Sequence, residues 1–333
     1  MTKESFIYLE KCLFQRKLGV SSMSVMVTGG TGFVASYVLR ELLGQGYDVI
    51  AFDYLVNTES VADIVDQIEI VKGDVRDLAE IIEVIKKYGI KYVVHTASLL
   101  TADSQKRPYT ALGINVEGTV NILETARLMD LAQVVYMSST AVYGYTEEGK
   151  VIDEEYPQKP NTIYGATKLL CEHYGLNYNK EFGLGFIALR FPIIYGPWQS
   201  SRGFSSFKEI IEKPFFGEPA RVPIGGDQKY DGVYVKDVAR AIVSACLAKE
   251  PKHRIFNIGT SEMHTLRELA DIVRKIVPNA VFEIGPGFDI AEPVRGPLNM
   301  TKAKEELGYE PQFPLEEGVK DYIEVLKHMP SRR

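Results

Sequence analysis

The feature that most constrains this sequence is a regular alternation of short apolar runs with segments of helical period, which begins at Met23 and lasts to about residue 190. Strands that alternate with helices predict a parallel sheet, because parallel neighbours must be joined by a long crossover, and such a sheet carries helices on both faces. We therefore predict an α/β fold with a doubly wound parallel sheet of about seven strands. The expected strands lie at 25–28, 47–53, 92–96, 133–138 and 185–189, and the expected helices at 33–43, 78–88, 109–129 and 163–181.

The alternation loosens beyond Phe191, where prolines 192, 197, 214, 219 and 223 interrupt the chain and a helix-rich stretch follows from Val235. Such a change of pattern predicts a smaller C-terminal lobe packed on the first domain. We expect an N-terminal extension at 1–22, a first domain at 23–190, and a lobe formed mainly by 191–333, with some of its segments returning to the first domain.

Several local features predict a cytoplasmic location. The apolar run of the extension is short, is broken by Glu10 and Lys11, and precedes no small-residue cleavage site, which disfavours a secretory signal and leaves an upstream start codon or a loose arm. No apolar stretch approaches the roughly 18 residues that cross a bilayer. Cys12, Cys171 and Cys246 stand far apart without metal-like spacing, so we expect reduced thiols and no metal site.

Charge and composition narrow the class of partner. A hydrophobic content of 45% supports a sizeable core, and the formal net charge is −6 with acidic and basic residues mixed along the chain. Nucleic acids and anionic membranes select clustered basic residues, which are missing from this sequence. We therefore expect a small-molecule substrate, with neither nucleic acid nor membrane as partner.

A glycine-rich turn joins the first strand to the first helix, in the segment VMVTGGTGFVA at 25–35. Gly29 and Gly32 lack a Cβ, which lets the backbone approach a pyrophosphate whose charge is then held by the amides at the helix N-terminus. Ala35 is the third small residue of the motif and allows close packing of helix on strand. The segment predicts a dinucleotide site on a Rossmann fold.

Two aspartates extend this prediction. Asp53 ends the second strand about twenty residues after the turn, where a carboxylate accepts hydrogen bonds from the adenine ribose and repels a 2′-phosphate. This position favours NAD over NADP. Asp74 lies in the stretch KGDVR, where it is placed to meet the adenine ring, although a solvated turn aspartate would explain it equally well.

A second group of residues predicts proton chemistry. Tyr164 and Lys168 are four apart in a helical segment, so both project from one face, and Ser139 follows a strand whose carboxyl end is where open α/β sheets bind ligands. Lowering a tyrosine pKa from near 10 to about 7 takes roughly 4 kcal/mol of differential stabilisation of the phenolate. A nearby lysine cation and the positive charge of NAD can supply it.

The motifs TGGTGFVA, GDV, HTAS, NVEGT, SSTAVYG and YGATK together resemble those of the NAD-dependent epimerase/dehydratase family of extended short-chain dehydrogenases/reductases, of the UDP-glucose 4-epimerase-like kind. The resemblance covers nearly everything after residue 22. It implies that Tyr164 exchanges the substrate hydroxyl proton, that Lys168 holds the nicotinamide ribose and lowers the tyrosine pKa, and that Ser139 binds the reacting oxygen. It also implies a substrate-binding C-terminal lobe and a homodimer formed through two helices of the first domain, one of them bearing Tyr164.

The residues expected to bind NAD and substrate follow from the motifs and this resemblance. Asn115 matches a family asparagine near the cofactor, and Ala97 and Ser98 match a loop over the pyrophosphate. The candidates for NAD are Gly29, Thr31, Gly32, Phe33, Val34, Asp53, Asp74, Val75, Ala97, Ser98, Asn115, Tyr164 and Lys168, and those for substrate are Ser139, Thr140, Tyr164 and Arg295.

The chain departs from the family at two places that concern the substrate. Members acting on nucleotide sugars usually carry an asparagine where this chain has Ile193 and an arginine where it has Tyr230. Arg295 is left as the family-like ligand of a phosphate or carboxylate, although an exposed structural arginine would explain it equally well, and Arg202 and Lys229 are weaker candidates.

Three functions remain open from the sequence. The first is a nucleotide-sugar epimerase in which NAD is recycled; dehydration ranks last, because no acidic pair stands beside Ser139. The second is a net dehydrogenase of a small hydroxy acid, polyol or amino alcohol, since HTASLLTADSQKRP resembles the threonine-dehydrogenase branch. The third is a non-catalytic NAD-binding protein, which the presence of Tyr164 and Lys168 disfavours.

His95, which ends a strand, is expected to be a hydrogen-bonded core residue, and Tyr143 could be strand-end packing.

Overall fold

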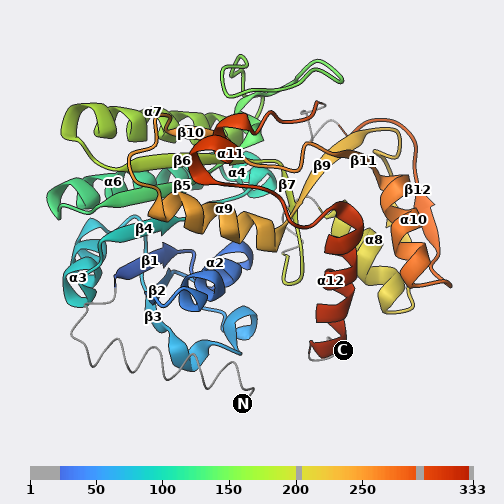
Figure 1. Cartoon of the computed structure of the whole chain (residues 1–333), viewed down its shortest axis with the longest axis horizontal. Coiled ribbons are helices and arrows are strands. Elements are labelled where there is room, and N and C mark those ends of the chain that lie inside the picture. Colours follow the sequence, from blue (N-terminus) through green and yellow to red (C-terminus); the bar gives the residue numbers. More distant parts are fainter. Residues whose placement is uncertain (1–22, 200–204, 290–295, 330–333) are drawn as a thin grey trace.

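A computed structural model describes residues 23–199, 205–289 and 296–329. Its centre is a sheet of seven strands in the order β10-β6-β5-β4-β1-β2-β3, in which every pair is parallel. The predicted doubly wound α/β fold is therefore confirmed (Figure 1). The strands are β1 (Ser24–Thr28), β2 (Asp48–Asp53), β3 (Glu69–Lys72), β4 (Tyr92–His95), β5 (Gln133–Ser139), β6 (Phe186–Phe191) and β10 (Ile255–Asn257).

Two helical layers cover this sheet because side chains of each buried strand alternate between its faces. Val25 and Val27 join the core beneath one layer, whereas Met26 joins the core beneath the other. The first layer contains α2 (Phe33–Gly44) and α9 (Val235–Leu247), and the second contains α3 (Leu78–Tyr88), α6 (Gly118–Leu128) and α7 (Ile163–Phe182).

The helix expected at 109–129 is in fact three segments. Pro108, which fits the first turn of a helix, opens α5 (Pro108–Ala111), and a π-helical turn, η3 (Leu112–Glu117), follows before α6 begins. π-Helical turns are frequent at functional sites. Short helices α4 (Thr101–Lys106), η1 (Glu59–Val61), η2 (Val65–Gln67) and η4 (Thr140–Val142) complete this half of the chain.

The lobe gathers at one end of the sheet, where α8, α10 and α12 pack together (Figure 1). Its apolar residues, among them Phe207, Leu266 and Tyr322, belong to the same buried cluster as the α2 and α9 face of the sheet. The elements are β7 (Ile193–Tyr195), α8 (Ser206–Phe215), β8 (Ala220–Val222), β9 (Lys229–Tyr234), β11 (Met263–Thr265), α10 (Leu266–Ile276), β12 (Phe282–Ile284), α11 (Thr301–Leu307) and α12 (Leu315–His328).

The chain does not divide cleanly at residue 190. Strand β10 pairs with β6 at the edge of the large sheet, and α9 packs on α2, so both belong to the first domain although they follow the start of the lobe. The division into parts at 22 and 190 stays a prediction, to which these two returning segments add detail.

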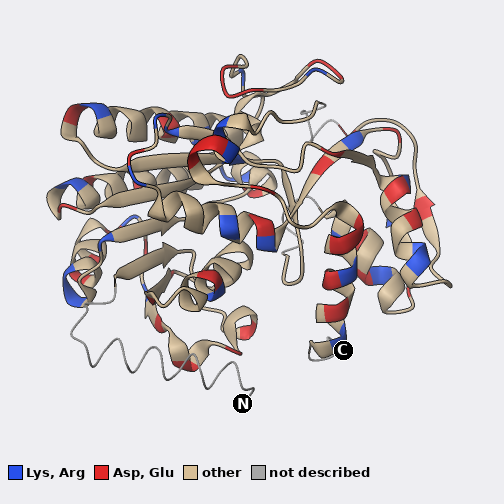
Figure 2. Ribbon diagram, in the orientation of Figure 1, with Lys and Arg blue, Asp and Glu red and all other residues tan. Residues whose placement is uncertain are grey.

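Charged residues of both signs are interspersed along the helices (Figure 2). Within the described ranges, no helix is both long and apolar enough to cross a membrane.

Candidate functional site

A cavity of about 1050 Å³ lies at the carboxyl ends of the parallel strands, between the sheet and the lobe. This is where open α/β sheets bind their ligands. Of the predicted residues, it is lined by Gly29, Thr31, Gly32, Phe33, Val34, Asp53, Asp74, Val75, Ala97, Ser98, Ser139, Thr140, Tyr164 and Lys168.

The glycine-rich turn forms one end of the cavity. Gly29 has φ of +64°, a left-handed conformation that favours glycine, and its carbonyl accepts from Gly32 N at 2.8 Å. Gly30, which the sequence analysis did not single out, is equally constrained, because a Cβ there would lie 2.5 Å from Ala51 Cα. The Gly29-Gly30 doublet is the signal that could have identified it. Helix α2 begins directly after Gly32, so its first amides face the cavity.

Asp53 lies at the end of β2 with its carboxylate turned to the glycine-rich turn. Its Oδ2 accepts from Thr31 N at 2.9 Å and from Thr31 Oγ1 at 2.8 Å, and its Oδ1 accepts from Leu55 N at 3.1 Å. Asp74 instead pairs with Arg76, whose Nε lies 3.0 Å from both carboxylate oxygens. Hydrogen bonds from Arg76 lower the pKa of Asp74, which therefore stays ionised.

Asn115 does not line the cavity in the described structure and holds its neighbouring loop instead. Its Oδ1 accepts from Leu99 N at 2.7 Å, and its Nδ2 donates to Leu99 O and to Thr167 Oγ1, both at 3.1 Å. Because Leu99 follows Ala97 and Ser98 directly, Asn115 fixes the loop that carries both. Its contribution to cofactor binding stays a prediction, exerted through this loop.

The three predicted catalytic side chains meet at the end of β5. Tyr164 and Lys168 lie one turn apart on α7, with the lysine Nζ 5.4 Å from the tyrosine ring centroid and donating to Met137 O at 2.6 Å. Ser139, two residues after Met137, accepts from Ala141 N at 3.2 Å through Oγ and keeps its hydroxyl hydrogen to donate. Lys168 is only 2% exposed, and its burial lowers the pKa to about 8.

The start of α7, next to Tyr164, is held by a residue that the sequence analysis missed. Gln105 on α4 lines the cavity and accepts from Ile163 N through Oε1 at 2.6 Å, while Thr162 caps the helix by accepting from Gly165 N at 3.0 Å. No local pattern reveals the Gln105 contact, because the two residues are 58 apart in the chain.

His95 is a hydrogen-bonded core residue, as predicted. Its Nδ1 lies 2.7 Å from Thr28 Oγ1 and its Nε2 lies 3.0 Å from Thr119 Oγ1. Since Thr119 already donates to Asn115 O at 2.6 Å, it accepts from the Nε2 hydrogen, which leaves Nδ1 as an acceptor. Burial, followed by the charge of Lys168, lowers the pKa of His95 to about 3, so the ring is neutral.

Tyr143 does more than pack at a strand end. Its buried hydroxyl donates to Asn257 Oδ1 at 2.6 Å and accepts from Arg190 Nη1 at 3.0 Å. It therefore connects the segment after β5 to β6 and β10.

The substrate end of the cavity is formed by β7, the start of α8 and Asp289. Ile193 lines it, whereas Tyr230 is buried and donates its hydroxyl to Gly225 O at 3.3 Å. Among the described lining residues the basic side chains are Arg76, beside Asp74, and Lys168; Lys229 is not among them. Arg202 and Arg295 lie outside the described residues.

Comparison with known proteins identifies the family. The chain matches the NAD dependent epimerase/dehydratase family over residues 25–259. It is similar to a putative UDP-glucose 4-epimerase of Methanocaldococcus jannaschii, with 34% identity over 307 residues that cover 91% of this chain and 98% of the relative.

Two solved structures resemble it over 92% of this chain and 99% of their own, each with a TM-score of 0.82. They are a UDP-glucose 4-epimerase from Thermotoga maritima with UDP-glucose, at 28% identity, and a UDP-glucose 4-epimerase from Thermus thermophilus in complex with NAD, at 27%. The resemblance drawn from the motifs is thereby confirmed: this chain is an NAD-dependent enzyme of the short-chain dehydrogenase/reductase type and belongs to the NAD-dependent epimerase/dehydratase family.

Proposed function

We propose that this enzyme is an NAD-dependent nucleotide-sugar epimerase. The observation that carries the proposal is the convergence of Ser139, Tyr164 and Lys168 in the same cavity as the glycine-rich turn and Asp53. The similarity to the M. jannaschii relative and to the T. maritima structure with UDP-glucose supports a nucleotide sugar as substrate.

The cofactor end fits a dinucleotide. Gly29, with its left-handed φ of +64°, and Gly32 line the cavity without side chains, which lets a pyrophosphate approach the turn, and the first amides of α2 offer donors to its charge. Asp53 is held in place to accept from the adenine ribose, and Asp74 with Val75 flanks the adenine. Thr31, Phe33, Val34, Ala97 and Ser98 complete the residues that we assign to NAD binding.

The glycine-rich turn and Asp53 would hold NAD, which would supply a reversible hydride acceptor for the sugar, so no net NADH is expected. Tyr164 removes the proton of the sugar hydroxyl and later gives it back, which requires a lowered phenol pKa. The nearby ammonium of Lys168 lowers that pKa, and the Ser139 hydroxyl, with Thr140 beside it, holds the reacting oxygen. Arg295 is assigned to a phosphate of the substrate on the family resemblance alone.

The protein is further proposed to be a cytoplasmic homodimer. The elements α5, η3 and α7 pack against one another and carry four exposed large apolar side chains: Tyr109, Leu112, Leu170 and Tyr174, of which Tyr109 is 88% exposed. Apolar side chains exposed together favour a second copy as partner. The cytoplasmic assignment rests on the two buried free thiols of the described residues, Cys171 and Cys246.

The test is to incubate the purified protein with UDP-sugars and, separately, with small hydroxy acids and polyols, while following NADH absorbance and analysing the sugars. Conversion of a UDP-sugar to its epimer without net NADH is the expected result. Accumulation of NADH with a small substrate would contradict the proposal.

A net dehydrogenase of a small hydroxy acid, polyol or amino alcohol is the second candidate. One observation favours it: the described substrate end carries Ile193 where related enzymes present an amide to a diphosphate, and Tyr230 is buried and uncharged. A non-catalytic NAD-binding protein is disfavoured, because Tyr164 and Lys168 meet in the cavity.

A further inference from the structure

A buried ion pair lies next to the cavity without lining it. Arg190 on β6 donates to Glu172 on α7 through two hydrogen bonds, from Nε to Oε1 at 2.9 Å and from Nη2 to Oε2 at 2.6 Å. The two side chains are 4% and 2% exposed. Burying both charges has a large desolvation cost, and apolar side chains of similar volume often stabilise a protein as well. Stability alone therefore does not account for the pair.

Glu172 also joins α7 to the strand end that carries Ser139. Ser138 donates from Oγ to Glu172 Oε1 at 2.5 Å, and one helical turn earlier Lys168 donates to Met137 O at 2.6 Å. Consecutive residues of β5 are thus bonded to consecutive turns of α7. These two contacts fix the distance between Lys168 and Ser139, which follows Ser138 directly.

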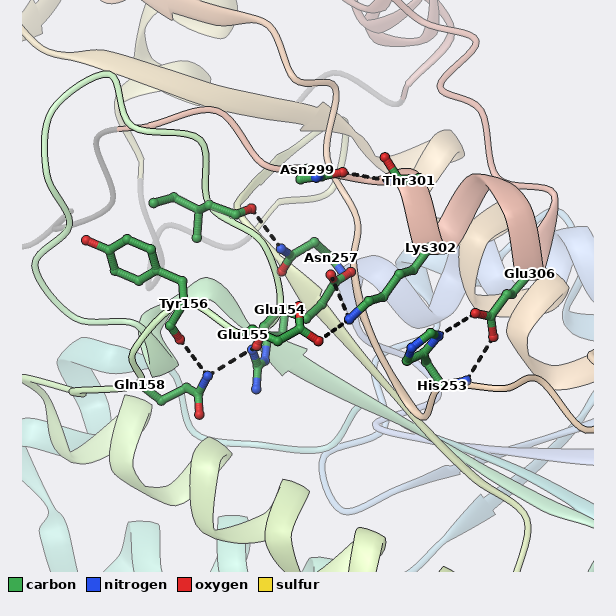
Figure 3. Close-up of polar contacts among 12 residues, drawn as sticks. Glu154, Glu155, Tyr156, Gln158, His253, Asn257, Asn299, Thr301, Lys302 and Glu306 are labelled. Atoms are coloured by element: carbon green, nitrogen blue, oxygen red, sulfur yellow. Dashed lines mark hydrogen bonds and ion pairs between the residues drawn. The ribbon is translucent and has the colours of Figure 1, made fainter.

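Arg190 is held from its other side by a network that reaches β10 and α11. Its Nη1 donates to Tyr143 OH and to Glu154 O, both at 3.0 Å. Figure 3 shows Glu154 beside Asn257, whose N donates to Glu154 Oε1 at 2.9 Å, and beside Lys302, whose Nζ lies 3.5 Å from Oε2. The guanidinium therefore has a fixed place that does not depend on Glu172.

Lys168 lies on α7 one turn after Tyr164 and one turn before Glu172. Burial lowers the pKa of Lys168, and the charge of Glu172 opposes that effect. His95, on β4, stays neutral beside it. The titratable or charged groups that act on it within the described residues come from β4, β5 and α7: His95, Tyr136, Tyr164, Cys171 and Glu172. Arg190, on β6, is linked to Lys168 through its ion pair with Glu172.

Building on the proposed function, we propose that Glu172 and Arg190 are positioning residues that hold Lys168 and Ser139 at their working separation and, by balancing each other's charge, keep Lys168 protonated at neutral pH. If Arg190 were absent, the unbalanced charge of Glu172 would over-stabilise the ammonium of Lys168. If Glu172 were absent, the ammonium of Lys168 would lose a carboxylate charge that opposes the effect of burial.

The test is to titrate Lys168 by NMR in protein with isotope-labelled lysine. The Lys168→Met variant assigns the Lys168 signal. Glu172→Gln leaves the arginine charge unbalanced and is expected to move the midpoint of Lys168 to lower pH by about one pH unit. Arg190→Met leaves the carboxylate unbalanced and is expected to move it to higher pH by about as much. If the ion pair had only a structural role, the two variants would not shift the Lys168 midpoint in opposite directions.

Two matched controls lie on the same side of the sheet. Glu124→Gln removes a carboxylate that touches α7 through Tyr178, and Arg254→Met removes a guanidinium near the end of α7, but neither residue contacts Lys168. Neither variant is expected to move the midpoint. Shifts of equal sign in Glu172→Gln and Arg190→Met, or no shift in either, would overturn the proposal.

The combination of Glu172→Gln with Arg190→Met keeps the charge balance and removes the bonds, and variants of this kind usually fold. We expect its lysine midpoint to match the parent protein and its kcat to fall about tenfold, a loss worth about 1.4 kcal/mol. An unchanged kcat would refute the positioning role even if the single variants did not fold. The NMR measurement needs no substrate, so inactivity toward nucleotide sugars would overturn the proposed function without deciding this question.

Discussion

The two ends of the cavity are built in different ways. The cofactor end is made of a turn and strand ends whose backbone atoms are in contact, so that a Cβ at Gly30 would lie 2.5 Å from Ala51 Cα. The other end is made of side chains from β7, the start of α8 and Asp289, among them Ile193, which lines the cavity from the buried core. We therefore expect cofactor binding to be fixed by local chain geometry and substrate choice to depend on a few side chains.

The largest effect on activity is expected at Tyr164, in the part of the cavity between its two ends. Replacing Tyr164 by Phe removes the proton acceptor, and we expect kcat to fall about a thousandfold while NAD affinity is retained. The measurement is steady-state turnover beside NAD titration. Tyr145→Phe, at an exposed tyrosine outside the cavity, is the matched control and should be fully active. Substantial turnover by the Tyr164 variant would remove this residue from the mechanism.

The rigidity of the cofactor end is tested by Gly30→Ala. The new methyl group meets Ala51 and Val27 O, so we expect a loss of about 1–3 kcal/mol in the free energy of unfolding, together with weaker NAD binding. Denaturant unfolding measures the first effect. Gly44→Ala, at the end of α2, meets nothing within 4 Å and should leave NAD binding unchanged and stability no lower. Equal stability of the two variants would show that the turn tolerates movement.

A change of charge at the same end should affect mainly the cofactor. Asp53→Asn weakens the acceptor for the ribose hydroxyls, and the loss of one charged hydrogen bond predicts about ten- to a hundredfold weaker NAD binding. Discrimination against NADP should relax as well, because the repulsion of a 2′-phosphate is lost. Fluorescence titration with both cofactors checks this, with the exposed Asp63→Asn as control. Unchanged discrimination would mean that another group selects NAD.

The smallest effect is expected at the substrate end. Ile193→Asn presents an amide at the cavity wall, and one neutral hydrogen bond predicts a KM for a UDP-sugar lower by up to about tenfold, with kcat little changed. Ile193→Leu controls for shape. If the asparagine variant instead binds UDP-sugars no better than the leucine variant, the diphosphate does not lie against residue 193.

The sequence was most informative where contacts are local. The predicted turn and the Tyr164 and Lys168 spacing each depend on residues a few positions apart, and the structure brings them into one cavity. The π-helical turn that carries Asn115 was not predicted, because its pattern differs little from an α-helix. The Glu172–Arg190 pair was missed for the opposite reason: only the fold brings β6 beside α7, although Glu172 continues the spacing of Tyr164 and Lys168 by four.

Strand β10 has a consequence for how the protein is made. The large sheet is completed only when Ile255–Asn257 pairs with β6, long after β6 itself has left the ribosome. During synthesis the edge of β6 therefore stays open to other strands, which is a hazard for aggregation. A fragment that ends near residue 190 would keep that open edge permanently. We expect domain exchanges between members of this family to succeed only when β10 is carried along with the first domain.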